Sequence, residues 1–208
     1  ALALGPRAVV NALTALFWFA SILWLFSPRV PSERKLGPWA WVLHLGGALF
    51  LGLFLACLGR LEGGPWPGGP GPQGGSARVF YALVVVWACD TGAYVCGSLL
   101  GRRRMWPAVS PRKTWEGAIG GTVLAVAAAI LLARPLLSGL SLPAAGFLGL
   151  LAAAAAQIGD LFESRLKRKA GVKDSGTFLP GHGGVLDRLD SLLFAAPVFS
   201  YGLNLLLG

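Results

Sequence analysis

The residues best suited to chemistry lie in one polar segment, Ser164 to Asp190, which has apolar sequence on both sides. It reads SRLKRKAGVKDSGTFLPGHGGVLDRLD and combines basic side chains, closely spaced glycines and aspartates. Glycines let backbone N–H groups approach a ligand closely, as they do in phosphate-binding loops. The segment therefore predicts a site for a phosphate-bearing ligand. The residues that would form it are Lys167, Arg168, Lys169, Lys173, Gly181, His182, Gly183 and Gly184.

Two aspartates close this segment at a spacing that suits one face of a helix. Asp187 and Asp190 are three residues apart, so a helix that begins near Gly184 would carry both carboxylates on the same side. Two carboxylates beside a cationic, glycine-rich loop suit a divalent metal ion that bridges phosphates. A basic loop on the inner face of a membrane would also explain the lysines, but it does not need the Pro-Gly-His-Gly-Gly run or the paired aspartates.

Two further aspartates lie in apolar surroundings, where an ionised carboxylate is costly unless it is paired or bound to a metal. Asp160, in the sequence QIGDLFE, is expected at the inner end of an apolar run, where it could share a metal ion with Asp187. The alternative is an interfacial carboxylate paired with a lysine or arginine. Asp90, in the sequence WACDTGAY, either lines a substrate cavity or pairs with a basic side chain for structural reasons.

A second basic motif, SPRKTWEGAIGG, begins at Ser110 and predicts the start of a helix. Ser110 is expected as the N-cap and Pro111 as the first helical residue. The N-terminus of such a helix, beside Arg112 and Lys113, would form an anion site. An ordinary helix start with interfacial charges remains open as the alternative.

The composition indicates that membrane-spanning helices must position these residues. Of the 208 residues, 55% are apolar and only 13% are charged, whereas soluble domains carry about 25% charged residues. We expect an all-α, polytopic transmembrane fold with about six spans, because lipid cannot satisfy free backbone groups. The expected spans are roughly Ala8–Phe26, Trp39–Gly59, Val79–Leu100, Gly117–Leu137, Leu142–Gly159 and Ser191–Leu206.

The distribution of basic residues predicts how these spans are oriented. The net charge is +9, and fourteen basic residues follow the first, third and fifth spans, against four on the opposite side. The positive-inside rule places the fourteen in the cytoplasm. Membrane orientation, anionic lipids and phosphate substrates account for this charge, so no nucleic-acid partner is expected. We expect one membrane-embedded catalytic domain over residues 1–208, with a flexible Gly/Pro-rich outer loop at 62–75 and further spans missing before residue 1.

The polar segment resembles the signature of the phosphatidate cytidylyltransferase (CDP-diacylglycerol synthase) family. The match fixes more than a dozen positions over 27 residues, which is far more specific than a lone glycine motif. The segments that contain Asp90, Lys113 and Asp160 look like parts of the same family. The matching positions of the polar segment are Ser164, Lys167, Arg168, Lys173, Asp174, Gly176, Pro180, Gly181, His182, Gly183, Gly184, Asp187, Arg188 and Asp190.

The resemblance implies an enzyme that condenses CTP with phosphatidic acid to give CDP-diacylglycerol and pyrophosphate. It implies a Mg²⁺ ion held by Asp160 and Asp187, with Asp190 as a third ligand or beside the site, and it leaves a second metal ion open. Lys167 and Lys173 are expected to take part in catalysis. The residues expected to bind substrate are Asp90, Arg112, Lys113, Arg168, Asp174, Gly181, His182, Gly183, Gly184 and Arg188.

The same resemblance sets the expected surroundings of the protein. It implies a bacterial inner membrane, contact with membrane lipids and an active site that faces the cytoplasm, and it leaves a homodimer open. Two other functions also remain open. A polyprenol or phytol kinase, or a CDP-archaeol synthase-like enzyme, would reuse similar parts. A transporter would use Asp90 and Asp160 to line an ion path, although the glycine-rich loop argues against it.

Overall fold

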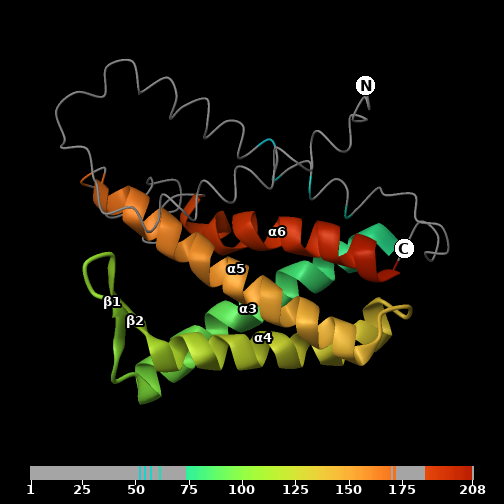
Figure 1. Cartoon of the computed structure of the whole chain (residues 1–208), viewed down its shortest axis with the longest axis horizontal. Coiled ribbons are helices and arrows are strands. Elements are labelled where there is room, and N and C mark those ends of the chain that lie inside the picture. Colours follow the sequence, from blue (N-terminus) through green and yellow to red (C-terminus); the bar gives the residue numbers. More distant parts are fainter. Residues whose placement is uncertain are drawn as a thin grey trace, which may run out of the picture.

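Four long helices and a β-hairpin form most of the described part of the chain in the computed structural model (Figure 1). The structure describes residues 52, 54, 57, 61, 74–169, 171 and 186–207. Apart from residues 52, 54 and 57, which are helical, the first two expected spans lie outside this part. The elements are α3 (Gly74–Leu100), β1 (Arg104–Trp106), β2 (Ser110–Thr114), α4 (Trp115–Leu136), α5 (Leu142–Lys169) and α6 (Leu186–Leu207).

All four helices are long and apolar enough to cross a membrane. Their candidate spans have 19 to 28 residues and a mean hydropathy between 1.3 and 1.9. Large apolar side chains on their outer faces are exposed, among them Leu99, Leu131 and Leu205, as expected where a helix faces lipid tails. The expected all-α, polytopic fold is confirmed, and the chain is an integral membrane protein.

The helices around the polar segment extend further than the sequence predicted. Helix α5 continues ten residues beyond Gly159, and α6 begins five residues before Ser191. The polar segment therefore begins and ends in helix. Helix α5 continues because residues 161–169 are rich in Leu, Glu, Lys and Arg, which favour helix whatever their polarity. At the other end of the bundle α3 begins at Gly74, so the last two residues of the predicted outer loop are helical.

The segment before α4 is a β-hairpin, which corrects the helix start predicted at Ser110. Strands β1 and β2 pair antiparallel, with Trp106 opposite Ser110. Ser110 precedes a proline, and a following proline disfavours helical backbone. The N-cap of α4 is instead Thr114, whose hydroxyl accepts a hydrogen bond from Gly117 N at 3.1 Å. Arg112 and Lys113 therefore lie on a strand and not in the first turn of a helix.

Close packing joins the helices into one bundle. Helix α3 packs along α4, α4 packs against α5, and α5 packs against α6. At the α3–α4 contact a Cβ atom on Gly121 would lie 2.6 Å from Cys89 O, and one on Gly92 would lie 2.8 Å from Gly120 O. Only residues without a side chain allow this approach, as is common between transmembrane helices.

The hairpin, the C-terminal end of α5 and the start of α6 meet at one end of the bundle (Figure 1). Of the basic side chains that the structure describes, nine lie at this end, and only Arg78 and Arg134 lie toward the other. The third and fifth loops were predicted to share one side of the membrane. Their arrangement in the bundle agrees with that prediction.

Candidate active site

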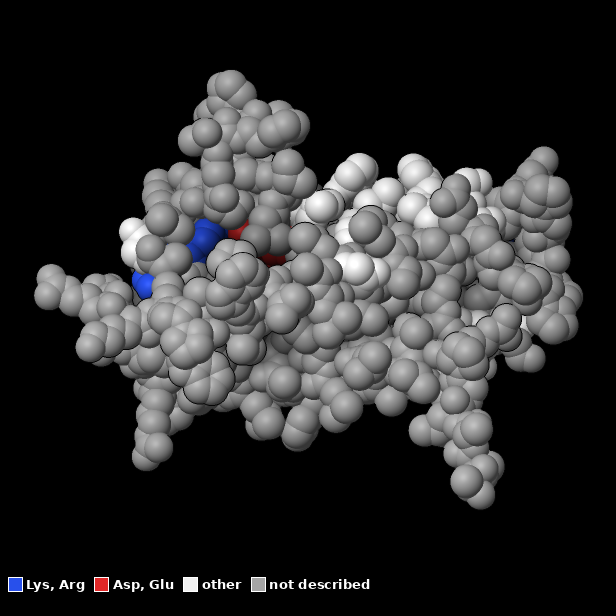
Figure 2. Space-filling view, turned by 90° about the horizontal axis from the view of Figure 1, so that it is seen from above, with Lys and Arg blue, Asp and Glu red and all other residues white. Residues whose placement is uncertain are grey.

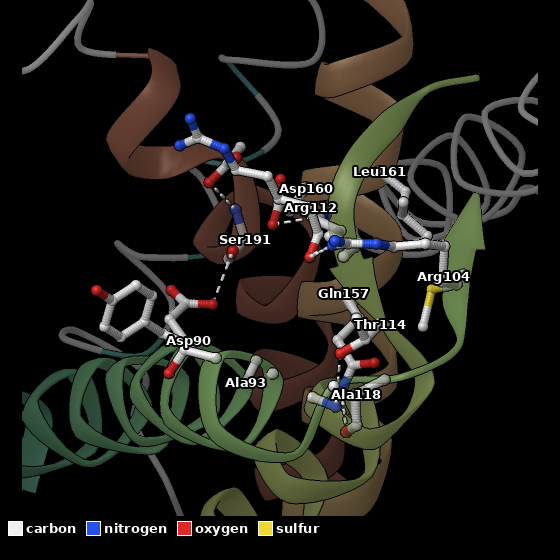
Figure 3. Close-up of a pocket in the computed structure, with 18 of the residues that line it drawn as sticks. Asp90, Ala93, Arg104, Arg112, Thr114, Ala118, Gln157, Asp160, Leu161 and Ser191 are labelled. Carbon is white, nitrogen blue, oxygen red and sulfur yellow. Dashed lines mark hydrogen bonds and ion pairs between the residues drawn. The ribbon is translucent and has the colours of Figure 1, made fainter. Parts of the chain in front are cut away.

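A cavity of about 670 Å³ lies among α3, the hairpin, α5 and α6 at the basic end of the bundle. Small residues of α3, including Ala93 and Gly97, line it, and Ala93 is labelled in Figure 3. In Figure 2 basic and acidic side chains are seen next to each other toward one end of the molecule. The polar and charged residues that line the cavity include Asp90, Arg104, Arg112, Lys113, Gln157, Asp160, Lys167, Asp190 and Ser191.

An ion pair joins the hairpin to α5 across this cavity. Lys113 Nζ lies 2.6 Å from Asp160 Oδ2, and both side chains are partly exposed, at 25% and 36%. The other carboxylate oxygen, Oδ1, accepts a hydrogen bond from Ser164 Oγ at 3.4 Å. The pairing alternative for Asp160 is therefore observed, with a lysine from the second basic motif. It also shows that a positively charged group fits beside this carboxylate.

Asp90 is linked to α6 through a hydroxyl group. Ser191 Oγ donates a hydrogen bond to Asp90 Oδ1 at 3.2 Å (Figure 3). Within the described residues Asp90 forms no ion pair, and it lines the cavity. This geometry favours the cavity-lining role over the structural ion pair.

A buried glutamate that the sequence analysis did not single out lies beside the cavity. Glu163 is only 3% exposed, and its Oε2 accepts a hydrogen bond from Lys167 Nζ at 3.1 Å. Its other carboxylate oxygen, Oε1, is buried and has no hydrogen-bond partner among the described residues. The available signal was its spacing, three residues after Asp160 and four before Lys167, which places all three on one face of a helix.

Gln157 is a second residue that the sequence analysis quoted without a role. Its Nε2 donates hydrogen bonds to Ala118 O and to Thr122 Oγ1, each at 3.0 Å. These bonds fix α5 against α4 beside the cavity. A polar amide inside an apolar helix was the sequence signal, because such a group needs a partner in a membrane.

Two arginines of α5 contact the hairpin. Arg168 Nε donates a hydrogen bond to Val109 O at 3.4 Å. The Arg165 guanidinium lies 5.7 Å from the centre of the Trp106 ring. Arg168 does not line the cavity, so the phosphate-binding role given to it remains a prediction.

The structure brings six of the predicted site residues to one cavity. These six are Asp90, Arg112, Lys113, Asp160, Lys167 and Asp190. The backbones of Asp187 and Arg188 lie in the first turn of α6, close to Asp190. The predicted site residues outside the described part of the chain are Lys173, Asp174, Gly181, His182, Gly183 and Gly184.

The carboxylates of the cavity fit a hard divalent cation by their chemistry but not by their present spacing. Asp90, Asp160 and Asp190 supply oxygen ligands of the kind that Mg²⁺ prefers, from three different helices. Within the described residues, however, no group of three His, Cys, Asp or Glu side chains is close enough to hold a metal ion. The arrangement therefore fits a Mg²⁺ ion that takes one or two protein carboxylates and completes its shell with water and phosphate oxygens.

The fold and the cavity together define a membrane-embedded protein with a charged cavity at one end of its helix bundle. Sequence comparison gives the family: the chain belongs to the cytidylyltransferase family, whose profile matches residues 2–206. This membership confirms the resemblance found in the polar segment.

Individual relatives support this assignment. The chain is 47% identical over 135 residues to a phosphatidate cytidylyltransferase of Bacillus subtilis, covering 64% of this chain and 49% of that protein. It is 43% identical over 134 residues to a phosphatidate cytidylyltransferase of Haemophilus influenzae, covering 62% and 46%. It is also 47% identical over 129 residues to the uncharacterized protein YnbB of Escherichia coli, covering 62% and 43%. The chain spans about half the length of the curated relatives it matches.

Proposed function

We propose that this protein transfers the cytidylyl group of CTP to phosphatidic acid, giving CDP-diacylglycerol and pyrophosphate for phospholipid biosynthesis. The observation that carries the proposal is the cavity at the basic end of the bundle, where lysines, arginines and carboxylates from five elements converge. This cavity occurs in a member of the cytidylyltransferase family with relatives named phosphatidate cytidylyltransferase. One substrate is a lipid and the other is a polyanion, so a basic cavity at the end of a membrane bundle suits both.

The basic residues of the cavity would hold the phosphate groups. Arg104, Arg112 and Lys113 approach from the hairpin, and Lys167 approaches from α5, so a polyphosphate between them would meet positive charge on two sides. Arginine and lysine are the usual protein partners of phosphate oxygens. The family resemblance adds further candidates to this set. They are Lys173, Asp174, Gly181, His182, Gly183, Gly184, Arg168 and Arg188.

The reaction follows from this arrangement. A phosphate oxygen of phosphatidic acid attacks the α-phosphorus of CTP in line, and the bond from that phosphorus to the β-phosphate oxygen breaks. The attacking phosphate is already ionised near neutral pH, so no strong general base is needed. Lys113 and Lys167 would stabilise the charge that develops on the transferred group and on the leaving pyrophosphate.

The carboxylates would serve a metal ion. Asp160 and Asp187 are the proposed ligands, with Asp190 as a third ligand or as support beside them. A Mg²⁺ ion bound there would supply neutralisation of phosphate charge. Lys113 would then leave Asp160 for a phosphate oxygen, since both partners of the present ion pair are partly exposed to the cavity.

The orientation of the protein completes the proposal. We place the basic end of the bundle in the cytoplasm of a bacterial cell, at the inner face of the inner membrane, by the positive-inside rule. CTP would reach the cavity from the cytoplasm, and phosphatidic acid would reach it from the surrounding lipid. Asp90, whose carboxylate faces the cavity from α3, would line the path of the substrates.

A direct assay tests the proposed function. Purified protein reconstituted in lipid would be incubated with Mg²⁺, phosphatidic acid and CTP labelled in the cytosine ring. The expected products are a lipid-extractable cytidine label and one pyrophosphate per label. Replacing phosphatidic acid with a polyprenol or phytol tests the kinase alternative, which would release CDP and leave no cytidine on lipid. A folded sample that produces no lipid-linked cytidine contradicts the proposal.

A further inference from the structure

The β1–β2 hairpin depends on other elements for its position. Within the described residues it pairs with no third strand, and an isolated two-stranded hairpin is marginally stable. It nevertheless carries three of the basic residues that line the cavity, Arg104, Arg112 and Lys113. Whatever fixes the hairpin therefore fixes three of the four basic residues that line the cavity.

The base of the hairpin is tied to the start of α4. The Glu116 carboxylate accepts hydrogen bonds from Arg102 N at 3.1 Å and from Arg103 N at 3.2 Å. Trp115 N donates to Arg103 O at 3.0 Å. These bonds close the base, but they do not determine whether the far end of the hairpin lies on α5 or away from it.

The far end of the hairpin is held by α5. Arg165, which is only 8% exposed, places its guanidinium over the Trp106 ring, and Arg168 donates to Val109 O in the turn between the strands. Val109 itself is 6% exposed. The two arginines are three residues apart and so lie on the same side of the helix.

We propose that Arg165 and Trp106 form a latch that docks the hairpin on α5 and thereby holds Lys113 in the cavity. Trp106 does not line the cavity, so it acts through Lys113 and is a positioning residue. The basic residues near the end of α5 then have two different roles, according to the side of the helix on which they lie. Lys167 lines the cavity, whereas Arg165 and Arg168 contact the hairpin. The docking itself is independent of the proposed function, and only its kinetic consequence rests on that function.

Limited proteolysis tests the docking without any activity. Trypsin should cut after the exposed strand residues Arg104 and Arg112 mainly when the hairpin leaves the bundle and opens, because cleavage needs a locally unfolded segment. In the reconstituted protein, Trp106→Ala and Arg165→Met should each speed cleavage at these bonds by about tenfold. Arg165→Lys should restore part of the protection, since lysine keeps a cation over the ring.

A matched control separates the latch from a general effect of losing a tryptophan. Trp87 is 60% exposed on α3 and lies outside the hairpin, so Trp87→Ala should leave cleavage after Arg104 and Arg112 unchanged. Equal cleavage rates in the wild type, Trp106→Ala and Arg165→Met would overturn the latch, whatever the activity of the protein.

A double-mutant cycle tests the link to Lys113. Trp106→Ala should raise the KM for CTP by about tenfold in the wild-type background but cause no further change in a Lys113→Met background. A purely structural role for Trp106 would instead lower activity equally in both backgrounds, and that result would overturn the positioning role. If the wild type itself transfers no cytidylyl group, the proposed function fails while the proteolysis result still decides the latch.

Discussion

Lys113 of β2 and Asp160 of α5 form an ion pair of 2.6 Å between two segments that lie 47 residues apart in the chain. Each residue belongs to a motif that stands out in the sequence for a different reason, one as a basic helix start and the other as a carboxylate in an apolar run. Their contact places both motifs in one cavity. Substituting either residue therefore also tests the role proposed for the other.

Replacing either partner should reduce activity much more than stability. Lys113→Met or Asp160→Asn should lower kcat/KM for CTP by on the order of 100-fold or more, because the first removes a positive charge proposed to stabilise the transferred phosphate and the second removes a proposed metal ligand. The free energy of unfolding should fall by only about 1 kcal/mol, since a partly exposed ion pair contributes little. Cytidylyl transfer and thermal unfolding in the same lipid–detergent mixture measure both effects. Arg134→Met, at the other end of α4, is the control. Near-normal turnover in Asp160→Asn would rule out its metal-binding role.

Glu163 should contribute to stability through its buried contact with Lys167. Glu163→Ala should lower the free energy of unfolding by about 3 kcal/mol, because it leaves the ammonium group of Lys167 without its carboxylate partner. Glu163→Gln keeps an acceptor oxygen and should cost about 1 kcal/mol. Denaturant titration followed by tryptophan fluorescence measures the difference. Lys167→Met in the Glu163→Ala background should recover part of the loss, and an additive result would show that the contact is unimportant.

Gly121 should be essential for the approach of α3 to α4. In Gly121→Ala the new methyl group would meet Cys89 O, so the two helices must separate, at a cost of about 1–3 kcal/mol. Gly146→Ala on α5 is the matched control. Its methyl group would lie 3.3 Å from Cδ1 of Ile130, the flexible end of a side chain. The melting temperature should fall in the first variant and stay within a degree or so in the second. Equal melting temperatures would contradict the close-packing argument.

Gln157 should link α5 to α4 with a measurable but modest energy. Gln157→Leu removes its hydrogen bonds to Ala118 O and Thr122 Oγ1 and should cost about 1 kcal/mol, the usual scale for such bonds between transmembrane helices. Thr122→Val removes only one of the two bonds and should cost less. Thermal unfolding of the two single variants and the double variant gives the coupling between them. A coupling of zero would show that the two side chains act independently.

The sequence alone determined the helices and most of the chemistry-bearing residues. A long apolar stretch in a membrane must be helical because lipid offers no partner to a free backbone group, so α3 and α4 were predicted to within about five residues. Residue type identified Asp90 and Asp160, since a carboxylate in apolar surroundings needs a partner or a function. Lys113 was identified through the basic motif that was predicted to start a helix. The four-residue spacing of Glu163 and Lys167 also indicated that they share one face of a helix, although the sequence analysis did not single out Glu163.

Only the tertiary structure decided which of these residues are neighbours. The sequence of β2 fits a helix N-cap locally, but its backbone pairs with β1, and the hairpin packs on α5 through Trp106 and Val109. Asp90 meets Ser191 because α3 and α6 approach each other at the basic end of the bundle. Periodicity in a sequence indicates which residues share a face of one helix. Which faces then meet depends on packing between segments far apart in the chain, where small residues such as Gly121 allow the closest approach.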